Sequence, residues 1–209
     1  MTVTTTPTPA RTDDATRVPL GTVRRTGFFV AAGAAVWAGA MALYSPQDTG
    51  SVAMTVNDLG ALPFQASLFA LVTLQLRTAA TGTSRLARGM LRVEYVLLSL
   101  ATLWTVLHGA FPAFRDDAWL AVLDMFWPLS MLGMAIIGIK ILFTGRWRGL
   151  ARVWPTIAES WALVTVPVFG VFGATAGQVA GVGHLLVGYV TLGLILALRP
   201  HLTVTSRVR

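Results

Sequence analysis

Two long apolar runs, which follow one another between Arg92 and Arg148, constrain the fold of this chain most. They cover residues 93–111 and 119–143. Each run is long enough, at about 1.5 Å per residue in a helix, to cross roughly 30 Å of hydrocarbon. Arginines lie at both outer ends, and Asp116 and Asp117 lie at the turn between the runs. The pattern predicts a transmembrane hairpin whose two ends lie on the same side.

The composition excludes the soluble classes of protein. The chain is 55% hydrophobic and only 12% charged, whereas soluble domains carry about 25% charged residues. The net charge of +7 comes from arginines beside the apolar runs, so it indicates membrane topology and not nucleic-acid binding. The chain has no cysteine, which excludes thiolate metal sites and thiol catalysis. We predict a polytopic integral membrane protein with no cofactor.

Apolar runs along the whole chain predict an all-α bundle of six transmembrane helices. The bundle covers residues 23–200, with a disordered cytoplasmic tail at 1–22 and a basic cytoplasmic tail at 201–209. Residues 45–62 are predicted to form a loop, because Pro46, Gly50 and Gly60 break regular structure. The spans are predicted at about residues 28–44, 63–77, 93–111, 119–143, 155–172 and 179–198.

The distribution of arginine predicts how the bundle is oriented. Outside the predicted spans, Arg115 alone lies on one side of the membrane, and all other arginines lie on the opposite side. By the positive-inside rule, both termini are cytoplasmic, in the cell membrane. One alternative concerns Arg24 and Arg25, which precede an apolar segment as in a twin-arginine signal peptide. We expect the first helix to be retained, because further membrane helices follow it.

Four ionisable residues near the outer ends of the predicted helices form a candidate outer polar site. Helical phase places His108 on one face with Glu94 and Thr105, and His184 on one face with small residues. We therefore expect the two histidines to approach each other, with Asp124 beside them. The candidate site consists of His108, Asp124, His184 and Asp58.

Several interpretations of this outer site stay open. The residues either hydrogen-bond across helices as structural groups or form an outward-facing pocket for a cation, a proton or a small ligand. His108, His184 and Asp124 are the residue types that bind zinc, although no HxxH or HExxH spacing supports a metal site. Haem held between the two histidines is a further alternative. We predict neither a metal nor a haem.

An inner polar layer, consisting of Glu94, Lys140 and Glu159, is predicted near the cytoplasmic face. Lys140 can extend along its aliphatic stem to the interface, and the two glutamates can pair with it or with nearby arginines. The functional alternative is a cytoplasmic gate or half of a proton path.

The sequence leaves two classes of function open. The first is a non-catalytic binding, transport-accessory or signalling component with an outward-facing polar pocket, embedded in the bilayer and able to associate through its helices with itself or with a membrane partner. The second is an intramembrane enzyme that uses Asp124 and a histidine as acid and base on a lipid or isoprenoid. The absence of nucleotide and nucleophile motifs favours the first.

Overall fold

The computed structural model describes residues 18–45 and 50–203, and every regular element in this part of the chain is helical. The first half contains α1 (Leu20–Leu43), α2 (Ser51–Arg77) and α3 (Arg85–Ala110), then a 3-10 turn η2 (Pro112–Phe114) and α4 (Ala118–Asp124). The second half contains α5 (Phe126–Thr144), α6 (Gly149–Ala158), α7 (Trp161–His184), a π-helical stretch η3 (Leu185–Val190), α8 (Thr191–Leu198) and η4 (Pro200–Thr203).

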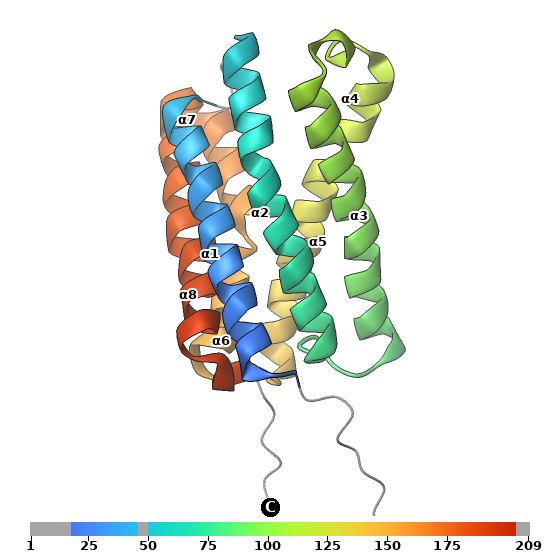
Figure 1. The fold of residues 1–209 in the computed structure, drawn as a ribbon, viewed down its shortest axis with the longest axis vertical. Helices are drawn as coiled ribbons and strands as arrows, with labels where there is room; N and C mark the ends of the chain where they lie inside the picture. Colours follow the sequence, from blue (N-terminus) through green and yellow to red (C-terminus); the bar gives the residue numbers. More distant parts are fainter. Residues whose placement is uncertain (1–17, 46–49, 204–209) are drawn as a thin grey trace, which may run out of the picture.

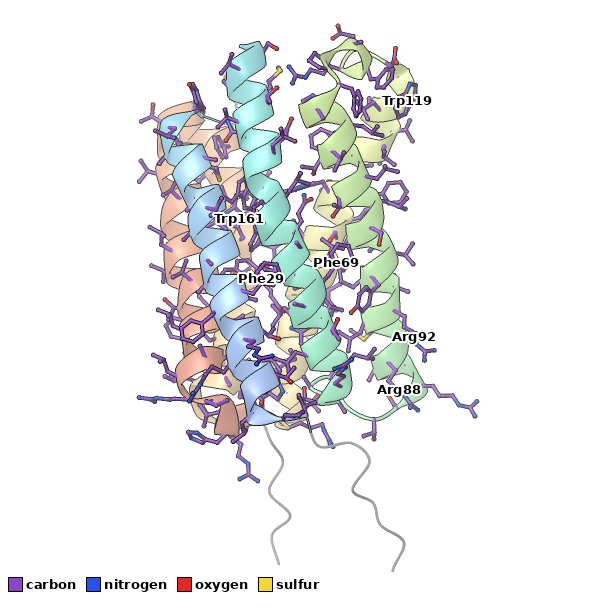
Figure 2. The ribbon with its side chains drawn as sticks, viewed as in Figure 1. Phe29, Phe69, Arg88, Arg92, Trp119 and Trp161 are labelled. Atoms are coloured by element: carbon purple, nitrogen blue, oxygen red, sulfur yellow. The ribbon has the colours of Figure 1, made fainter. Side chains whose placement is uncertain are left out.

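The long helices pack side by side along one axis (Figure 1). Neighbours in contact follow a closed ring, in which α1 packs on α2, α2 on α3, α3 on α5, α5 on α6, α6 on α8 and α8 on α1. Arg88 and Arg92 lie at one end of the bundle and Trp119 at the other (Figure 2). We call these the arginine end and the Trp119 end. The start of α1 and the last described helix, η4, both lie at the arginine end (Figure 1).

The chain reverses direction at Gly173, inside α7. Gly173 has φ 81° and ψ −176°, a conformation that only glycine adopts without strain. Trp161 Nε1 donates to the Gly181 carbonyl at 3.0 Å, and Trp154 Nε1 donates to the Gly188 carbonyl at 3.1 Å. From the first pair to the second, the number of the tryptophan falls while the number of its glycine partner rises, which is the pattern of two antiparallel segments. Residues 149–172 and 174–198 therefore form an antiparallel helical hairpin.

The outer surface of the bundle is apolar. Large exposed side chains include Val93 and Val96 on α3 and Leu132 and Ile136 on α5, and such extensive exposed apolar surface marks contact with a membrane or with a partner. Five stretches are long and apolar enough to cross a membrane: Leu20–Leu43, Ser51–Arg77, Arg85–Ala110, Ala118–Thr144 and Gly149–Leu198. The fold is thus all-α, with helices compatible with a multi-pass membrane protein.

Helix α2 differs most from its predicted bounds. It begins at Ser51, so most of the predicted loop is helical and Pro63 lies inside the helix. Tertiary packing overrides the breakers here, because Gly33 of α1 approaches the Pro63 carbonyl so closely that a Cβ on Gly33 would lie 2.6 Å from it. Asn57 also donates to the Tyr44 and Ser45 carbonyls, which ties the start of α2 to the end of α1.

Other helix boundaries also differ from the predicted ones. Helices α1 and α3 begin earlier than predicted, so Arg24, Arg25, Arg88 and Arg92 are helical. Ser84 caps α3 by accepting from the Ala87 N–H at 3.1 Å. The fourth predicted span is divided at Met125. The predicted tails lie mostly outside the described residues, apart from the start of α1 and the short helix η4.

Candidate functional site: an aromatic pocket at the Trp119 end

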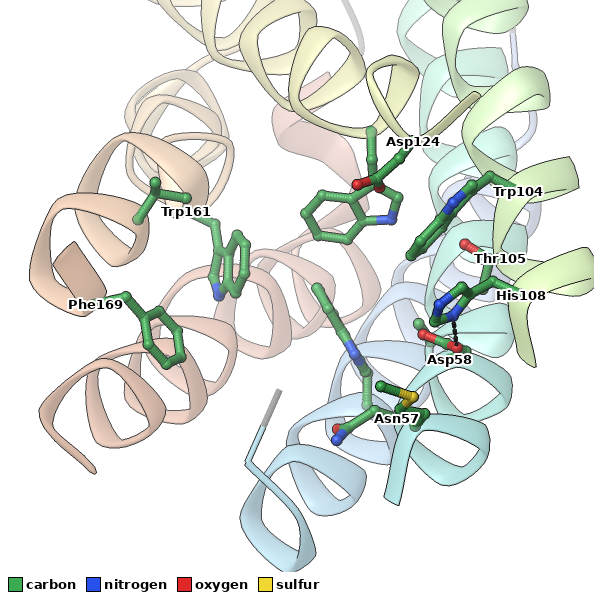
Figure 3. Close-up of a pocket in the computed structure, with 13 residues that line it drawn as sticks. Asn57, Asp58, Trp104, Thr105, His108, Asp124, Trp161 and Phe169 are labelled. Atoms are coloured by element: carbon green, nitrogen blue, oxygen red, sulfur yellow. Dashed lines mark hydrogen bonds and ion pairs between the residues drawn. The ribbon is translucent and has the colours of Figure 1, made fainter. Parts of the chain in front are cut away.

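A pocket of about 330 Å³ lies at the Trp119 end, between side chains of α1, α2, α3, α4, α5 and α7. Figure 3 shows the acidic residues and His108 on one side and Trp161 and Phe169 of α7 on the other. Asp124 and Val166, which both line the pocket, are exposed, so the pocket opens to the surface. The lining residues are Trp37, Met54, Asn57, Asp58, Ala61, Trp104, Thr105, His108, Asp124, Trp127, Trp161, Val166 and Phe169.

Asp58 and His108 form the polar centre of this aromatic pocket. His108 Nδ1 lies 2.6 Å from Asp58 Oδ2, and the exposed fractions of the two side chains are 18% and 15%. This is the only ion pair found among residues 18–45 and 50–203. Trp104 stacks on the His108 ring, with 4.7 Å between ring centroids. A carboxylate on one nitrogen and an indole on one face hold the imidazole in a single orientation.

Arg115 forms hydrogen bonds beside the pair of Asp58 and His108. Its Nε donates to the His108 carbonyl at 2.8 Å, and its Nη2 donates to Thr55 Oγ1 at 2.7 Å. The guanidinium therefore links the start of α2 to the end of α3. It satisfies carbonyl groups that the helix itself leaves without donors. Arg115, the one arginine that we predicted to lie on the outer side, thus holds together the two helices that carry Asp58 and His108.

Asp124 is the acidic group of the pocket that has no fixed partner. It lies at the end of α4, and no hydrogen bond to its carboxylate is found in the described part of the chain. Asp124 lies within electrostatic range of His108, which lines the same pocket. The position at His108 that we predicted for Asp124 is occupied by Asp58, because α2 begins early enough to bring Asp58 alongside the end of α3.

Four tryptophans from four different helices form the apolar wall. Trp37 of α1 contacts Trp127 of α5 and Trp161 of α7, with ring centroids 5.5 Å and 5.2 Å away. Trp127 and Trp161 also meet edge to face at 5.7 Å. Trp104 of α3 completes the set across the pocket (Figure 3). Aromatic rings in such contacts add about 0.5–1.5 kcal/mol per pair beyond burial, so the wall is a rigid part of the fold.

His184 lies outside the pocket, contrary to our expectation that it approaches His108. Its Nε2 lies 2.8 Å from the Ile157 carbonyl. That carbonyl belongs to the last turn of α6, where helical acceptors lose their partners. The predicted small-residue face of His184 is packed, since Gly188 lies against Ala158. The neighbour is α6, however, and not α3.

The candidate metal site is not assembled either. Across residues 18–45 and 50–203, no group of three or more His, Asp or Glu side chains is arranged to hold a metal ion. His108 faces Asp58 and His184 faces a backbone carbonyl, so neither a His108–His184–Asp124 metal site nor a haem between the histidines matches this arrangement.

The predicted inner residues also separate. Lys140 is exposed on α5, whereas Glu94 and Glu159 are each only 1% exposed. The glutamates accept hydrogen bonds from Ser130 and Gln75. The expected pairing of these glutamates with Lys140 or with arginines is therefore absent from the described residues.

The tryptophans are the pocket residues that sequence reasoning missed. None of the four is selected as a candidate site residue by the sequence patterns. Each tryptophan lies on a different helix, so periodicity within a helix carries no sign that the four meet. Comparison of the chain with protein-family models, with curated proteins and with solved structures finds no match.

Proposed function

We propose that this chain is a cell-membrane protein that crosses the bilayer six times with both ends cytoplasmic. Five apolar stretches support membrane insertion, and the reversal at Gly173 makes two antiparallel passes of the longest stretch. The grouping of Arg88 and Arg92 at one end supports the orientation (Figure 2). Reporter fusions at Gly50 and Gly82 should report opposite sides of the membrane. The same side for both would overturn the topology.

The first helix is retained in this proposal. Val30, Ala34 and Met41 of α1 are completely buried against the rest of the bundle. Cleavage after α1 would expose the faces of both α2 and α8, which pack on it. Mass spectrometry of the extracted protein should therefore find peptides from within α1. A mature protein that begins after Ala42 would contradict this.

The aromatic pocket, in this proposal, binds a small organic cation from the outer side. The observation that carries it is the arrangement of four tryptophans around an acidic group without a fixed partner, Asp124. Indole faces attract cations by about 0.5–2 kcal/mol each, and quaternary ammonium groups are recognised by such aromatic cages. A free carboxylate supplies the counter-charge. The volume of about 330 Å³ suits a small ligand.

Tryptophan fluorescence tests this proposal directly, because the pocket holds four of the seven tryptophans. Purified protein would be titrated with choline and, in parallel, with 3,3-dimethylbutan-1-ol, its uncharged analogue of the same shape. We expect a saturable fluorescence change with choline and a much weaker one with the alcohol. Equal responses would show that the pocket selects shape and not charge.

Two variants test whether choline binds in the aromatic pocket. Asp124→Asn removes the counter-charge with little change in size, and we expect it to weaken choline binding about tenfold, which corresponds to roughly 1.4 kcal/mol. Asp116→Asn is the matched control, since Asp116 is exposed at the same end but does not line the pocket. An equal loss in both variants would mean a general surface-charge effect.

An intramembrane acid–base enzyme is the second candidate, favoured by the 2.6 Å contact between His108 and Asp58. A carboxylate that orients an imidazole is the usual arrangement of a general base. Asp124, which lines the same pocket, would then act as the acid. Incubation with radiolabelled membrane lipids, followed by product analysis of wild type and His108→Gln, tests it. Turnover that disappears in the variant would favour this enzyme over the binding protein.

A further inference from the structure

Two buried glutamates lie deeper in the bundle than the aromatic pocket. Glu94 of α3 has Oε1 2.5 Å from the Ser130 hydroxyl of α5, while its Oε2 has no partner in the described structure. Glu159, between α6 and α7, accepts from Gln75 Nε2 on Oε1 at 2.7 Å, and its Oε2 likewise has no partner there. Both unpartnered oxygens face α5, at Gly133 and Gly138 respectively.

Two further polar groups without partners adjoin these carboxyl groups. The Tyr189 hydroxyl and the side-chain amide oxygen Oε1 of Gln75 are buried and form no hydrogen bond in the described residues. Tyr189 lies within electrostatic range of both glutamates, and the two glutamates lie within electrostatic range of each other. Tyr189 also belongs to the π-helical stretch η3, a feature common at functional sites. We call Glu94, Glu159, Tyr189 and Gln75 the carboxyl layer.

No positive charge balances this layer within residues 18–45 and 50–203. Lys140 on α5 and Arg77 on α2 are exposed, and Arg88 and Arg92 on α3 extend away from the bundle (Figure 2). Arg152 on α6 donates to the Leu142 carbonyl. The helix α8 carries no ionisable side chain. On α1, Arg24 donates to the Ala197 carbonyl, and Arg25 is exposed.

A buried carboxylate without a counter-charge costs several kcal/mol, and a bound proton removes that cost. We propose that Glu94 and Glu159 form an interior proton-binding site, in which the carboxyl groups carry exchangeable protons at neutral pH. The Tyr189 hydroxyl and the side-chain oxygen Oε1 of Gln75 are neighbouring buried groups without partners, and they are available to hydrogen-bond to a protonated carboxyl group. This site is separate from the aromatic pocket and does not depend on its ligand.

A groove between α3 and α5 gives a route to Glu94 from the side of the bundle. It has a volume of about 460 Å³ and is lined by Glu94 together with apolar side chains and glycines. Leu86, Val93 and Leu132, which line it, are exposed on the outer surface. Glu159 does not line this groove. An apolar reagent dissolved in the membrane can therefore reach Glu94 more readily than it can reach Glu159.

Dicyclohexylcarbodiimide provides the test, because it is apolar and reacts with protonated carboxyl groups. The carboxyl O–H adds across one C=N bond to give an O-acylisourea, which rearranges to a stable N-acylurea with no leaving group. Protein in liposomes would be treated at pH 7 and mapped by mass spectrometry. We expect Glu94 to be labelled at least about tenfold faster than the exposed Asp116 and Asp117, since each pH unit above a carboxyl pKa lowers the protonated fraction tenfold.

Controls separate a proton from other charge-balancing ligands. Raising the pH should slow labelling of Glu94, whereas adding sodium chloride at constant pH should not. Protection by sodium would overturn the proposal in favour of a metal-cation site. Equal labelling of Glu94 and Asp116 would overturn it as well. Choline is absent from this experiment, so its outcome is independent of whether the aromatic pocket binds cations.

Infrared spectroscopy gives a second measurement that needs no reagent access. Protonated carboxyl groups have a C=O stretch that is distinct from carboxylate bands and shifts on H/D exchange. We expect wild type to show this band at pH 7, and Glu94→Gln and Glu159→Gln each to lose part of it. Retention of the full band in both variants would overturn the proposal. If one variant fails to fold, the wild-type pH titration and the other variant still decide it.

Discussion

The aromatic pocket and the carboxyl layer are two polar regions of one bundle, and they differ in how their acids are satisfied. In the pocket, Asp58 has an imidazole partner and Asp124 reaches the surface. In the carboxyl layer, both glutamates are buried with one oxygen each unpartnered. Access to water or to a histidine therefore sets the cost of a charge at each acid, because these groups stabilise a carboxylate and an apolar interior does not.

A chain of aromatic rings connects the two regions. Trp37, at the pocket, stacks on Phe64 at 5.1 Å, and Phe64 meets the Tyr189 ring edge to face at 4.7 Å. These rings fill the space between the pocket and the carboxyl layer. We therefore expect the largest effect on both regions when the side chain of Trp37, the first ring of this series, is removed.

Trp37→Ala should lower the free energy of unfolding by about 3–5 kcal/mol, as truncations of large buried aromatics do. Trp37 is 6% exposed and touches Phe64, Trp127 and Trp161. Thermal unfolding in detergent, with choline titration of the folded fraction, measures the loss. Trp119→Ala is the control, because Trp119 is 48% exposed. It contacts one aromatic ring, Phe114, so we expect a smaller loss of about 1.5 kcal/mol or less. Equal losses would contradict a rigid aromatic wall.

Gly138→Ala should break the carboxyl layer while leaving the pocket intact. A Cβ at this position would lie 2.8 Å from both Glu159 Oε2 and the Pro155 carbonyl, and such overpacking costs about 1–3 kcal/mol. We expect lower thermal stability with unchanged choline affinity. Gly39→Ala is the control, since nothing lies within 4 Å of its added Cβ. A loss of choline affinity in Gly138→Ala would show that the two regions are coupled.

A double-mutant cycle sharpens the distinction between paired and unpaired acids. Asp58→Asn and His108→Gln should couple by about 1.5 kcal/mol, the low end for hydrogen bonds to charged groups, because both side chains keep some contact with solvent. His108→Gln and Glu94→Gln should add within about 0.5 kcal/mol. They lie 14 residues apart on α3, about 21 Å along the axis. Additive effects in the cycle of Asp58→Asn and His108→Gln would show that the two side chains do not stabilise each other.

The sequence was informative about features that depend on one helix alone, such as its position and its buried face. Each predicted span falls, to within one residue at its end, inside one of the five long apolar stretches. Helical phase correctly directed Glu94 and Thr105 inward, and His108 on the same helix faces Asp58 of α2. Contacts between helices were harder to foresee. The partner of His108 depended on α2 beginning at Ser51, and the tryptophans met from four helices. Breakers such as Gly50 and Gly60 suggested a loop, but the segment is helical, and Gly60 packs closely against Ala40 of α1.

The smallest expected effect is at His184, the residue that sequence reasoning assigned to the pocket. His184→Ala should lower the free energy of unfolding by about 1 kcal/mol or less, because it removes one hydrogen bond to the Ile157 carbonyl. That carbonyl also accepts from Ser160 Oγ at 2.8 Å, so it keeps a donor when the imidazole is gone. Choline affinity should stay at the wild-type value, since His184 faces the end of α6 and lines no part of the pocket. A choline affinity reduced as far as in Asp124→Asn would place His184 in the binding site, and would show that the hairpin of residues 149–198 rearranges when the ligand binds.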